Sequence, residues 1–475
     1  MTDHTPRHAT AQLALRTLAA VGSTLVIALA GLVAALGLPS GVVSALQGPI
    51  PELPVIEVLP AEPDRVLVCM GPALSFGSEG SRVMAYGAPS ETLAGSNITT
   101  TSIADTTVTD GFALDPTLTQ SPPVIVSQPV EAGALAATSS QLINNLNATG
   151  LAVSECQVPE RELWLVGGDT TTGRQTAISL VNPSDVQALV NLDVWGAQGP
   201  ILAPLGRGIL LPPSSQRVIS LAGLAPGESS PVVRVSSESV GVVASMHSTI
   251  VRGLEADGLT VNGSQPSPST LRVVTGVYTP PEEVIGPIKG KEGYRDVGAV
   301  LRLLSPDEDA EVRITVKAPG ATDSVIEATL VAGETKDLLL DEFNTGDIAV
   351  VAESDYPIVA SLRSSVGTDE RTDTDWVGSS PVLEGETAFA VPSNAEARVS
   401  FVNTGEVAIT LTLDNREITV PARGLMTRPV SAGPHTLRSA QPVFVALSIR
   451  GETVMDSLLV LPSPQPQSSV MVSVR

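Results

Sequence analysis

The sequence contains very few aromatic residues and very few lysines. Aromatic side chains make up 3% of its 475 residues, so any hydrophobic core has to be built mainly from Val, Leu, Ile and Ala. The lysines are only Lys289, Lys291, Lys317 and Lys336, and the formal net charge is −23. An acidic chain without a basic stripe does not suit binding to nucleic acid or to anionic lipid headgroups. The sequence therefore predicts no nucleic-acid partner.

Familiar catalytic motifs are also missing. The sequence has no G-x-S-x-G elbow, no Ser-x-x-Lys pair, no H-E-x-x-H, no phosphate-binding loop and no G-x-G-x-x-G. Only His247 and His435 follow the N-terminal apolar segment, and we interpret both as ordinary strand or turn residues. We therefore expect no enzyme, no catalytic residue and no cofactor, and an enzyme with an unrecognised site is the remaining alternative.

The composition that is present favours β-structure. Apolar residues make up 43% of the chain, and there are 41 glycines and 38 prolines. Frequent turn residues between apolar runs suit many short strands better than long helices. A chain of 475 residues exceeds what one hydrophobic core supports, so we expect several all-β domains.

One apolar segment near the N-terminus is long enough to cross a membrane. Residues 17–38 form an uncharged run of 22 residues, which spans about 33 Å as a helix. Arginines precede the run and the first charged residues after it are acidic, so residues 1–16 are predicted to be cytoplasmic and the bulk of the chain extracytoplasmic. The alternative is a signal peptide cleaved after the small-residue stretch Val43-Ser44-Ala45.

The next segment, residues 39–64, carries a proline every few positions. Such a segment does not form a helix or a central strand. We predict a semi-rigid stalk of extended polyproline character that holds the folded part away from the bilayer.

The two cysteines, Cys69 and Cys156, both follow the membrane segment. In an oxidising compartment two such thiols pair. The predicted disulfide closes a span of 87 residues and contributes about 4 kcal/mol in the chain-entropy model.

A similar pattern recurs three times along the chain. ISLVNPSD (178–185), LRLLSPDE (301–308) and VSFVNTGE (399–406) are apolar alternations that end in turn residues. Each is followed by another alternating run, exemplified by Val190, Leu192 and Val194, and later by a hairpin-like stretch. A common order of strands and turns indicates tandem repeats, and the turn spacing is typical of immunoglobulin-like β-sandwiches.

The predicted organisation follows from these features. Residues 65–160 match the repeat poorly and are interpreted as a β-rich module closed by the disulfide. The three β-sandwich repeats cover residues 161–270, 271–385 and 386–475. The connection between the first two repeats contains residues 280–296, which form either a binding loop or a solvated linker.

The sequence contains residues of the types that calcium sites and sugar-binding sites require. Asp369, Asp373 and Asp375 are weak calcium candidates if their loop folds back, although their spacing fits no EF-hand. Trp195 and Trp376 stand beside turn residues and are expected to be exposed, where they would stack on sugar rings, whereas Trp164 is expected in a core. The acidic run is usually only a solvated turn.

The motifs VLVCMGP (66–72), ELWLVGG (162–168) and SLVNPS (179–184), together with the N-terminal span and stalk, resemble a family of actinobacterial membrane-anchored envelope proteins of unknown function. The resemblance covers nearly the whole chain and carries no functional residue. It implies work in cell-envelope assembly beside a multispanning glycosyltransferase.

These observations lead to one functional hypothesis and one alternative. We expect a single-pass membrane protein that acts as a non-enzymatic extracytoplasmic scaffold or interaction protein, with an envelope protein or a wall polymer as partner. The alternative is a module that binds glycan or calcium through its inter-domain loops.

Overall fold

The chain divides into two compact units, Met1–Ala61 with Gln467–Arg475, and Glu62–Pro466. In the first, β1 (Val55–Val58) pairs antiparallel with β35 (Val470–Ser473). Part of the predicted polyproline stalk is therefore a β-strand. The computed structural model describes residues 55–58, 64–76, 82–103, 105–108, 113–114, 121–145, 148–294, 296–340, 345–368, 371–393, 396–451, 453–463 and 470–473.

The predicted membrane span, residues 17–38, lies outside these described residues. Among the residues that are described, no helix is both long enough and apolar enough to cross a bilayer.

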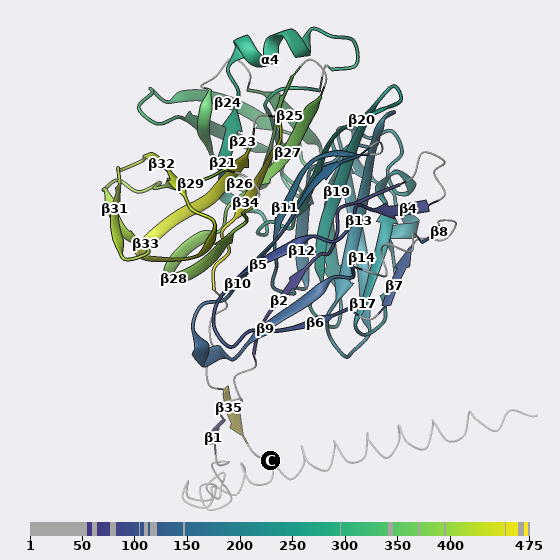
Figure 1. The fold of residues 1–475 in the computed structure, drawn as a ribbon, viewed down its shortest axis with the longest axis vertical. Helices are drawn as coiled ribbons and strands as arrows, with labels where there is room; N and C mark the ends of the chain where they lie inside the picture. Colours follow the sequence, from purple (N-terminus) through teal and green to yellow (C-terminus); the bar gives the residue numbers. More distant parts are fainter. Residues whose placement is uncertain are drawn as a thin grey trace, which may run out of the picture. The chain divides into compact units, whose positions relative to one another are not determined.

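The unit Glu62–Pro466 is built almost entirely of strands, as the composition predicted (Figure 1). Its described part has one α-helix and three short 3₁₀ helices, which are α4 (Glu282–Lys289), η1 (Val130–Ala132), η2 (Pro204–Gly206) and η3 (Leu221–Gly223). The strands form four successive modules, which we call the N-terminal, second, third and C-terminal modules.

The second module is a sandwich of two antiparallel sheets. In the first sheet, β12 (Glu162–Val166) pairs with β18 (Val232–Ser237), which pairs with β14 (Ala188–Gly196). The outer edge of β14 is covered by β15 (Gly199–Ile201) and β16 (Ile209–Leu211). The second sheet has the order β20 (Glu255–Gly263), β19 (Val243–Arg252), β13 (Arg174–Asn182) and β17 (Ser215–Ser220).

The same pairing order recurs in the next two modules. In both, one long strand crosses from the first sheet into the second. The third module consists of β21 (Ser269–Thr279), β22 (Val300–Leu304), β23 (Ala310–Lys317), β24 (Ser324–Leu330), β25 (Thr335–Leu339), β26 (Gly346–Gly367) and β27 (Thr372–Gly378). The C-terminal module consists of β28 (Val382–Val391), β29 (Glu396–Val402), β30 (Ile409–Leu413), β31 (Arg416–Val420), β32 (Leu425–Val430), β33 (Gly433–Arg450) and β34 (Met455–Leu459).

The immunoglobulin-like part of the prediction is not confirmed. In an immunoglobulin sandwich the second strand shares its sheet with the fourth and fifth strands. Here the second strand of each module pairs with the next-to-last one, as β13 does with β19. Alternation in the sequence reveals which face of a strand is buried but not which strand lies beside it. The pairing order could therefore not be predicted from the alternation.

The N-terminal module has the same pairing in a reduced form. β2 (Arg65–Cys69) pairs with β9 (Val124–Gln128), which pairs with β6 (Thr99–Ser102). In its second sheet, β11 (Thr149–Glu155) pairs with β10 (Ala136–Asn144), which pairs with β5 (Ser90–Ala94). Four further short strands are β3 (Leu74–Phe76), β4 (Arg82–Ala85), β7 (Asp105–Val108) and β8 (Ala113–Leu114), of which β7 pairs with β17.

Each of the last three modules encloses one apolar core to which both of its sheets contribute. The alternating run of the second module is confirmed, since Val190, Leu192 and Val194 on β14 are buried and the residues between them are partly exposed. Leu, Val and Ile dominate the cores, as the shortage of aromatic residues requires.

The recurring N-P-S and N-T-G turns have a common structural role. At the end of β13, the buried side chain of Asn182 accepts a hydrogen bond from the Ser184 N–H (3.0 Å) and donates to the carbonyl of Pro212 (3.0 Å), directly after β16. Asn403, at the end of β29, accepts from the Gly405 N–H (2.9 Å) and donates to the carbonyl of Pro421 (2.9 Å). Each asparagine closes its own turn and holds in place the segment that follows an edge strand of its module, which is β16 for Asn182 and β31 for Asn403.

The four modules form a closed circuit of apolar contacts. The N-terminal module packs on the second module, the second on the third, and the third on the C-terminal module. The circuit closes where Ala388 and Ala390 of β28 pack against Ala94 of β5. We call β11, β20, β27 and β34 the closing strands, because each ends its module. They contact one another, β11 and β27 each touching both β20 and β34.

Candidate functional site

A groove with a volume of about 560 Å³ lies between the third and C-terminal modules. Its volume is within the range of ligand sites in proteins. The third module contributes the end of β21, the start of α4 and the end of β26, and the C-terminal module contributes the start of β29, the end of β33 and the residue before β34. The lining residues are Tyr278, Pro280, Pro281, Val284, Val366, Gly367, Glu396, Arg450, Gly451 and Val454.

Arg450 and Tyr278 form the polar part of this groove. The Cζ atom of Arg450 lies 4.0 Å from the centre of the Tyr278 ring, a cation–π contact across the module boundary. Nη1 of Arg450 is 3.5 Å from Oδ1 of Asp347, whose Oδ2 accepts a hydrogen bond from Nε of Arg398 at 2.8 Å. Two arginines thus share one aspartate, and Arg450 is also part of the groove lining.

The apolar wall of the groove is held by α4 and the segment after it. Ile285 and Ile288 of α4 are buried against Val297, whereas Val284 is 50% exposed at the groove. Downstream, Asp296 pairs with Arg174 and Arg252 of the second module at 2.6 and 2.7 Å. The segment predicted as a connection, residues 280–296, therefore lies within the third module, between β21 and β22, and its described part is tied to the second module through Asp296.

Three side chains supply the polar chemistry of the groove. The ionisable groups among its lining residues are Tyr278, Glu396 and Arg450. The apolar surface of Pro280, Pro281 and the valines, with one arginine and one glutamate, suits an extended segment.

A second constellation lies inside the molecule, where the closing strands meet. Each closing strand pairs with another strand on one side only, so its other edge has N–H groups without a ladder partner. Asp373 on β27 accepts such N–H groups from all four closing strands, namely from Leu151 (2.9 Å), Met455 (3.0 Å), Thr374 (3.0 Å) and Leu259 (3.3 Å). A side chain at Gly150 would collide with Asp373, since a Cβ there lies 2.4 Å from Oδ1.

Three more carboxyl groups extend this buried cluster, which we call the central acids: Asp373, Asp375, Asp456 and Glu155. Asp456 of β34 accepts the N–H of Val153 at 2.6 Å, and Glu155 of β11 accepts the N–H of Leu459 at 3.3 Å. Burial raises the pKa of Glu155 to about 7 and that of Asp375 to about 6. Burial also raises the pKa values of Asp373 and Asp456 well above the ordinary range.

Two of the three calcium candidates lie on a strand and not on a loop. Asp373 and Asp375 belong to strand β27 and are 1% exposed, and Asp369 lies outside the described residues. Both oxygens of Asp373 are occupied by N–H donors. In the described part of the chain, no group of three or more His, Cys, Asp or Glu residues is placed to hold a metal ion. In the sequence these acids stand in short segments, TDTDWVG in β27 and MDSLL in β34, where acidic residues lie close to apolar ones.

The expectation that Trp195 and Trp376 are exposed is wrong, because both are buried between modules. Trp195 is 8% exposed and stacks on Trp164 with ring centres 5.3 Å apart. Trp376 is 4% exposed, and the guanidinium of Arg302 lies 4.3 Å from its ring centre. Sequence reasoning placed these rings beside turns, but the turns meet a neighbouring module.

The two histidines in the described part of the chain, His247 and His435, have structural roles. Nδ1 of His247 accepts a hydrogen bond from the Leu74 N–H at 3.2 Å, which ties the second module to the N-terminal one. Burial lowers the pKa of His247 to about 3, so this residue is neutral. His435 lies within β33, not in a turn, and bonds to Asp414 at 2.6 Å.

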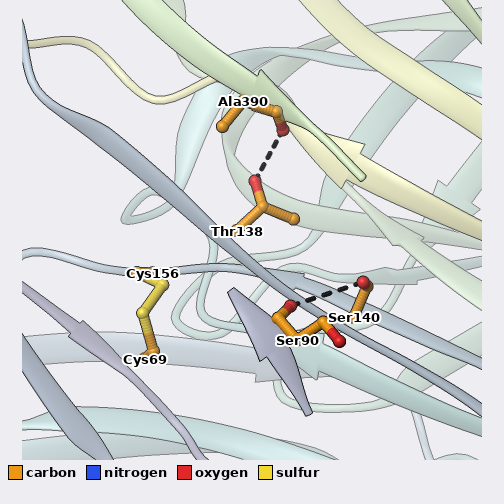
Figure 2. Close-up of a disulfide and its surroundings, with 6 residues drawn as sticks. All are labelled: Cys69, Ser90, Thr138, Ser140, Cys156 and Ala390. Atoms are coloured by element: carbon orange, nitrogen blue, oxygen red, sulfur yellow. Dashed lines mark hydrogen bonds between the residues drawn. A yellow bond between two sulfur atoms is a disulfide. The ribbon is translucent and has the colours of Figure 1, made fainter. Parts of the chain in front are cut away.

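The predicted disulfide is present. Figure 2 shows Cys69, at the end of β2, joined to Cys156, directly after β11. The same view shows the Thr138 hydroxyl donating to the carbonyl of Ala390 at 2.7 Å, where the circuit of modules closes. Both cysteines belong to the small core of the N-terminal module, and a disulfide compensates for limited core burial.

Comparison with known proteins identifies the family of the chain. Residues 114–422 match a family described as a family of unknown function (DUF5719), and the chain belongs to it. No curated protein matches the chain.

Three solved structures are similar to parts of the chain. Thermotoga maritima protein 1070 is 22% identical over 23% of this chain and 93% of its own length, with a TM-score of 0.20. The Anabaena sensory rhodopsin transducer is 24% identical over 21% of this chain and 91% of its own, with a TM-score of 0.16. A tetra-tandem repeat from the extending region of a large adhesion protein is 12% identical over 79% of this chain and 92% of its own length, with a TM-score of 0.12. These TM-scores are too low to assign the fold.

Proposed function

We propose that this chain is a non-enzymatic, membrane-anchored scaffold of the actinobacterial cell envelope whose groove docks an extended segment of a partner protein. The partner belongs to wall-polymer assembly, and a membrane glycosyltransferase is the candidate that the sequence resemblance suggests. Residues 17–38 anchor the scaffold, and its modules arose by duplication of one sandwich. The groove between the third and C-terminal modules is the observation that carries the proposal.

The walls of the groove support docking because they are held in place before a ligand arrives. Val273 and Val351 of the third module pack against Val402 and Phe444 of the C-terminal module. Asp347 bonds to Arg398 across the same boundary. Preorganised walls reduce the entropy that binding has to offset.

The lining also fits an extended segment in its chemistry. Aromatic side chains such as Tyr278 line grooves that bind extended, proline-rich peptides. Arg450 and Glu396, paired across β33 and β29, offer one donor group and one acceptor group to the backbone or side chains of the ligand. The disulfide is consistent with an oxidising compartment outside the cytoplasm.

The test is site-specific photocrosslinking in intact cells. A photoreactive residue replaces Val284, which lines the groove and is 50% exposed. We expect one defined crosslinked partner, lost when Val454→Trp fills the groove. Val325→Trp is the matched control, because Val325 on β24 is 45% exposed and is not part of the lining. A crosslink that persists in Val454→Trp, or no crosslink in the unmodified background, contradicts the proposal.

A further inference from the structure

A small cavity of about 30 Å³ lies between the second and third modules, and we call it the boundary cavity. It forms where β13, β19 and β20 of the second module meet β26 and β27 of the third. A cavity of this volume has room for one small ion or about two water molecules, but not for a sugar ring or a peptide. Its lining includes Gly168, Arg174, Thr249, Gly258, Arg363 and Trp376.

The wall of the boundary cavity contains a cation that has no partner. Within the described part of the chain, Arg363 on β26 forms no hydrogen bond and no ion pair, and its Nε atom is buried without an acceptor. Its Cζ atom lies 5.6 Å from the centre of the Trp376 ring, a contact that supplies no hydrogen-bond acceptor. A buried donor without an acceptor costs free energy, and native structures seldom retain one without a reason.

The other arginines at the same boundary have carboxylate partners. Burial acts to lower the pKa of Arg252, but its bonds to Asp296 and Asp257 outweigh that effect, so the pKa is raised. For Arg363, burial has the larger effect and the pKa is lowered, because the carboxylates near it do not replace the lost hydration. The ion pairs at this boundary are Arg174–Asp296 (2.6 Å), Arg252–Asp296 (2.7 Å) and Arg302–Asp337 (2.9 Å).

The two carboxylates that line the boundary cavity, Asp169 and Asp296, bond to groups other than Arg363. Asp296 bonds to the two arginines of the second module, and Oδ1 of Asp169 accepts the N–H (2.7 Å) and the hydroxyl (2.6 Å) of Thr171. The end of β26, beyond which residues 369 and 370 are not described, lies four residues from Arg363, about 13 Å along the strand. The position beside Arg363 therefore suits an anion from outside the chain.

We propose that the boundary cavity binds one small monovalent anion, chloride or the carboxylate group of a small organic acid, which pairs with Arg363 and joins the second module to the third. A guanidinium binds such anions through charge-assisted N–H bonds. Gln175 also lines the cavity, and its Oε1 accepts the N–H of Phe76 at 3.1 Å, which leaves its NH₂ group as a second donor. Because the whole chain carries −23, binding has to depend on this local cation and not on the field of the protein.

The anion site is separate from the groove. No residue lines both the boundary cavity and the groove. The anion acts on the boundary between the second and third modules, whereas the groove lies between the third and C-terminal modules. A failure of partner docking in the groove therefore leaves the anion site testable, and the reverse also holds.

The test measures the urea unfolding of the full chain while chloride replaces methanesulfonate, a larger monovalent anion, at constant ionic strength. An ion that binds only the folded state multiplies the ratio of folded to unfolded chain by 1 + [ion]/Kd, which is about elevenfold at ten times Kd. We expect this gain for the unmodified chain. A parallel titration with formate shows whether the halide or the carboxylate gives the larger gain at equal concentration.

The variant Arg363→Gln distinguishes this site from a general effect of salt. Without chloride or formate it should be at least as stable as the unmodified chain, because it removes a buried charge that has no partner. With either anion it should show no gain, so that the unmodified chain becomes the more stable of the two. Arg416→Gln is the matched control, since it removes the same charge from an exposed position on β31, and it should keep the full dependence on the anion.

Bromide in place of chloride gives a direct measurement. Crystals of the unmodified chain in bromide should show an anomalous scattering peak beside Arg363, and the absence of a peak there overturns the inference. Equal gains from the anions in the unmodified chain and in Arg363→Gln, or no gain in the unmodified chain, also overturn it. A loss of stability in Arg363→Gln without either anion means that Arg363 already has a partner within the chain, which overturns it as well.

Discussion

Glu155 makes the stability of the molecule depend on pH. It is fully buried on β11, where it accepts hydrogen bonds from Gln157 (3.0 Å) and from the N–H of Leu459 (3.3 Å). Burial raises its pKa from the ordinary 4.5 to about 7, and the nearby Asp375 adds to the increase. The folded state therefore binds this proton more tightly than the unfolded state does.

The sign and size of the effect follow from linkage. Below pH 4.5 the carboxyl is protonated in both states, and its contribution to stability is fully present. As the pH rises from 4.5 to about 7, only the unfolded state releases the proton, so the free energy of unfolding falls. The difference in pKa corresponds to about 3 kcal/mol, which is lost by pH 8.

Glu155→Gln removes the titrating carboxyl group, and the amide oxygen of the glutamine still accepts a hydrogen bond. The free energy of unfolding of this variant minus that of the unmodified chain should rise by about 3 kcal/mol between pH 4.5 and 8. Urea unfolding followed by the fluorescence of the buried tryptophans measures it. Glu384→Gln, on an exposed position of β28, is the control and should leave the pH profile unchanged. Parallel pH profiles for Glu155→Gln and the unmodified chain would refute the reasoning.

Two further variants test what holds the modules together. Replacing both Cys69 and Cys156 by serine should lower the free energy of unfolding by about 4 to 5 kcal/mol, because the disulfide closes a separation of 87 residues. Calorimetry measures this loss, and adding a reducing agent should have no effect on the unfolding of this variant. Arg302→Met should lower the free energy of unfolding, measured in urea, by about 3 to 5 kcal/mol, because it leaves Asp337 and the carbonyl of Gly168 without their buried partner. A loss below about 1 kcal/mol, the size expected for an exposed ion pair, would contradict this role.

The sequence predicted local structure well where one strand and its turn decide it. Alternation identified the buried faces of β14, β23 and β30, and the two cysteines were paired correctly. The turn that follows ISLV was predicted from the sequence. The hydrogen bonds by which Asn182 holds the chain after β16 were not predicted. These features depend on period, turn chemistry and the number of cysteines, all of which can be counted along the chain.

The sequence did not reveal features made by more than one module. The N-terminal module was judged different because its sequence matches the repeat poorly, yet its described strands β2, β9, β6, β5, β10 and β11 pair as their counterparts do in the other modules. The groove could not be predicted, since its two walls lie far apart in the sequence. Two of the central acids, Asp373 and Asp375, were assigned to a loop, because an acidic run in a single sequence is usually a solvated turn.

The sequence by itself determined that the described part of the chain is almost entirely β, that its recurring alternating runs are strands and that the two cysteines pair, because periodicity and turn residues act over a few positions. Only the tertiary structure decided which strands are neighbours, how the modules close their circuit and where the groove lies. Those properties arise from surfaces that meet across long distances in the chain, and nothing in a local pattern specifies the partner of a buried face.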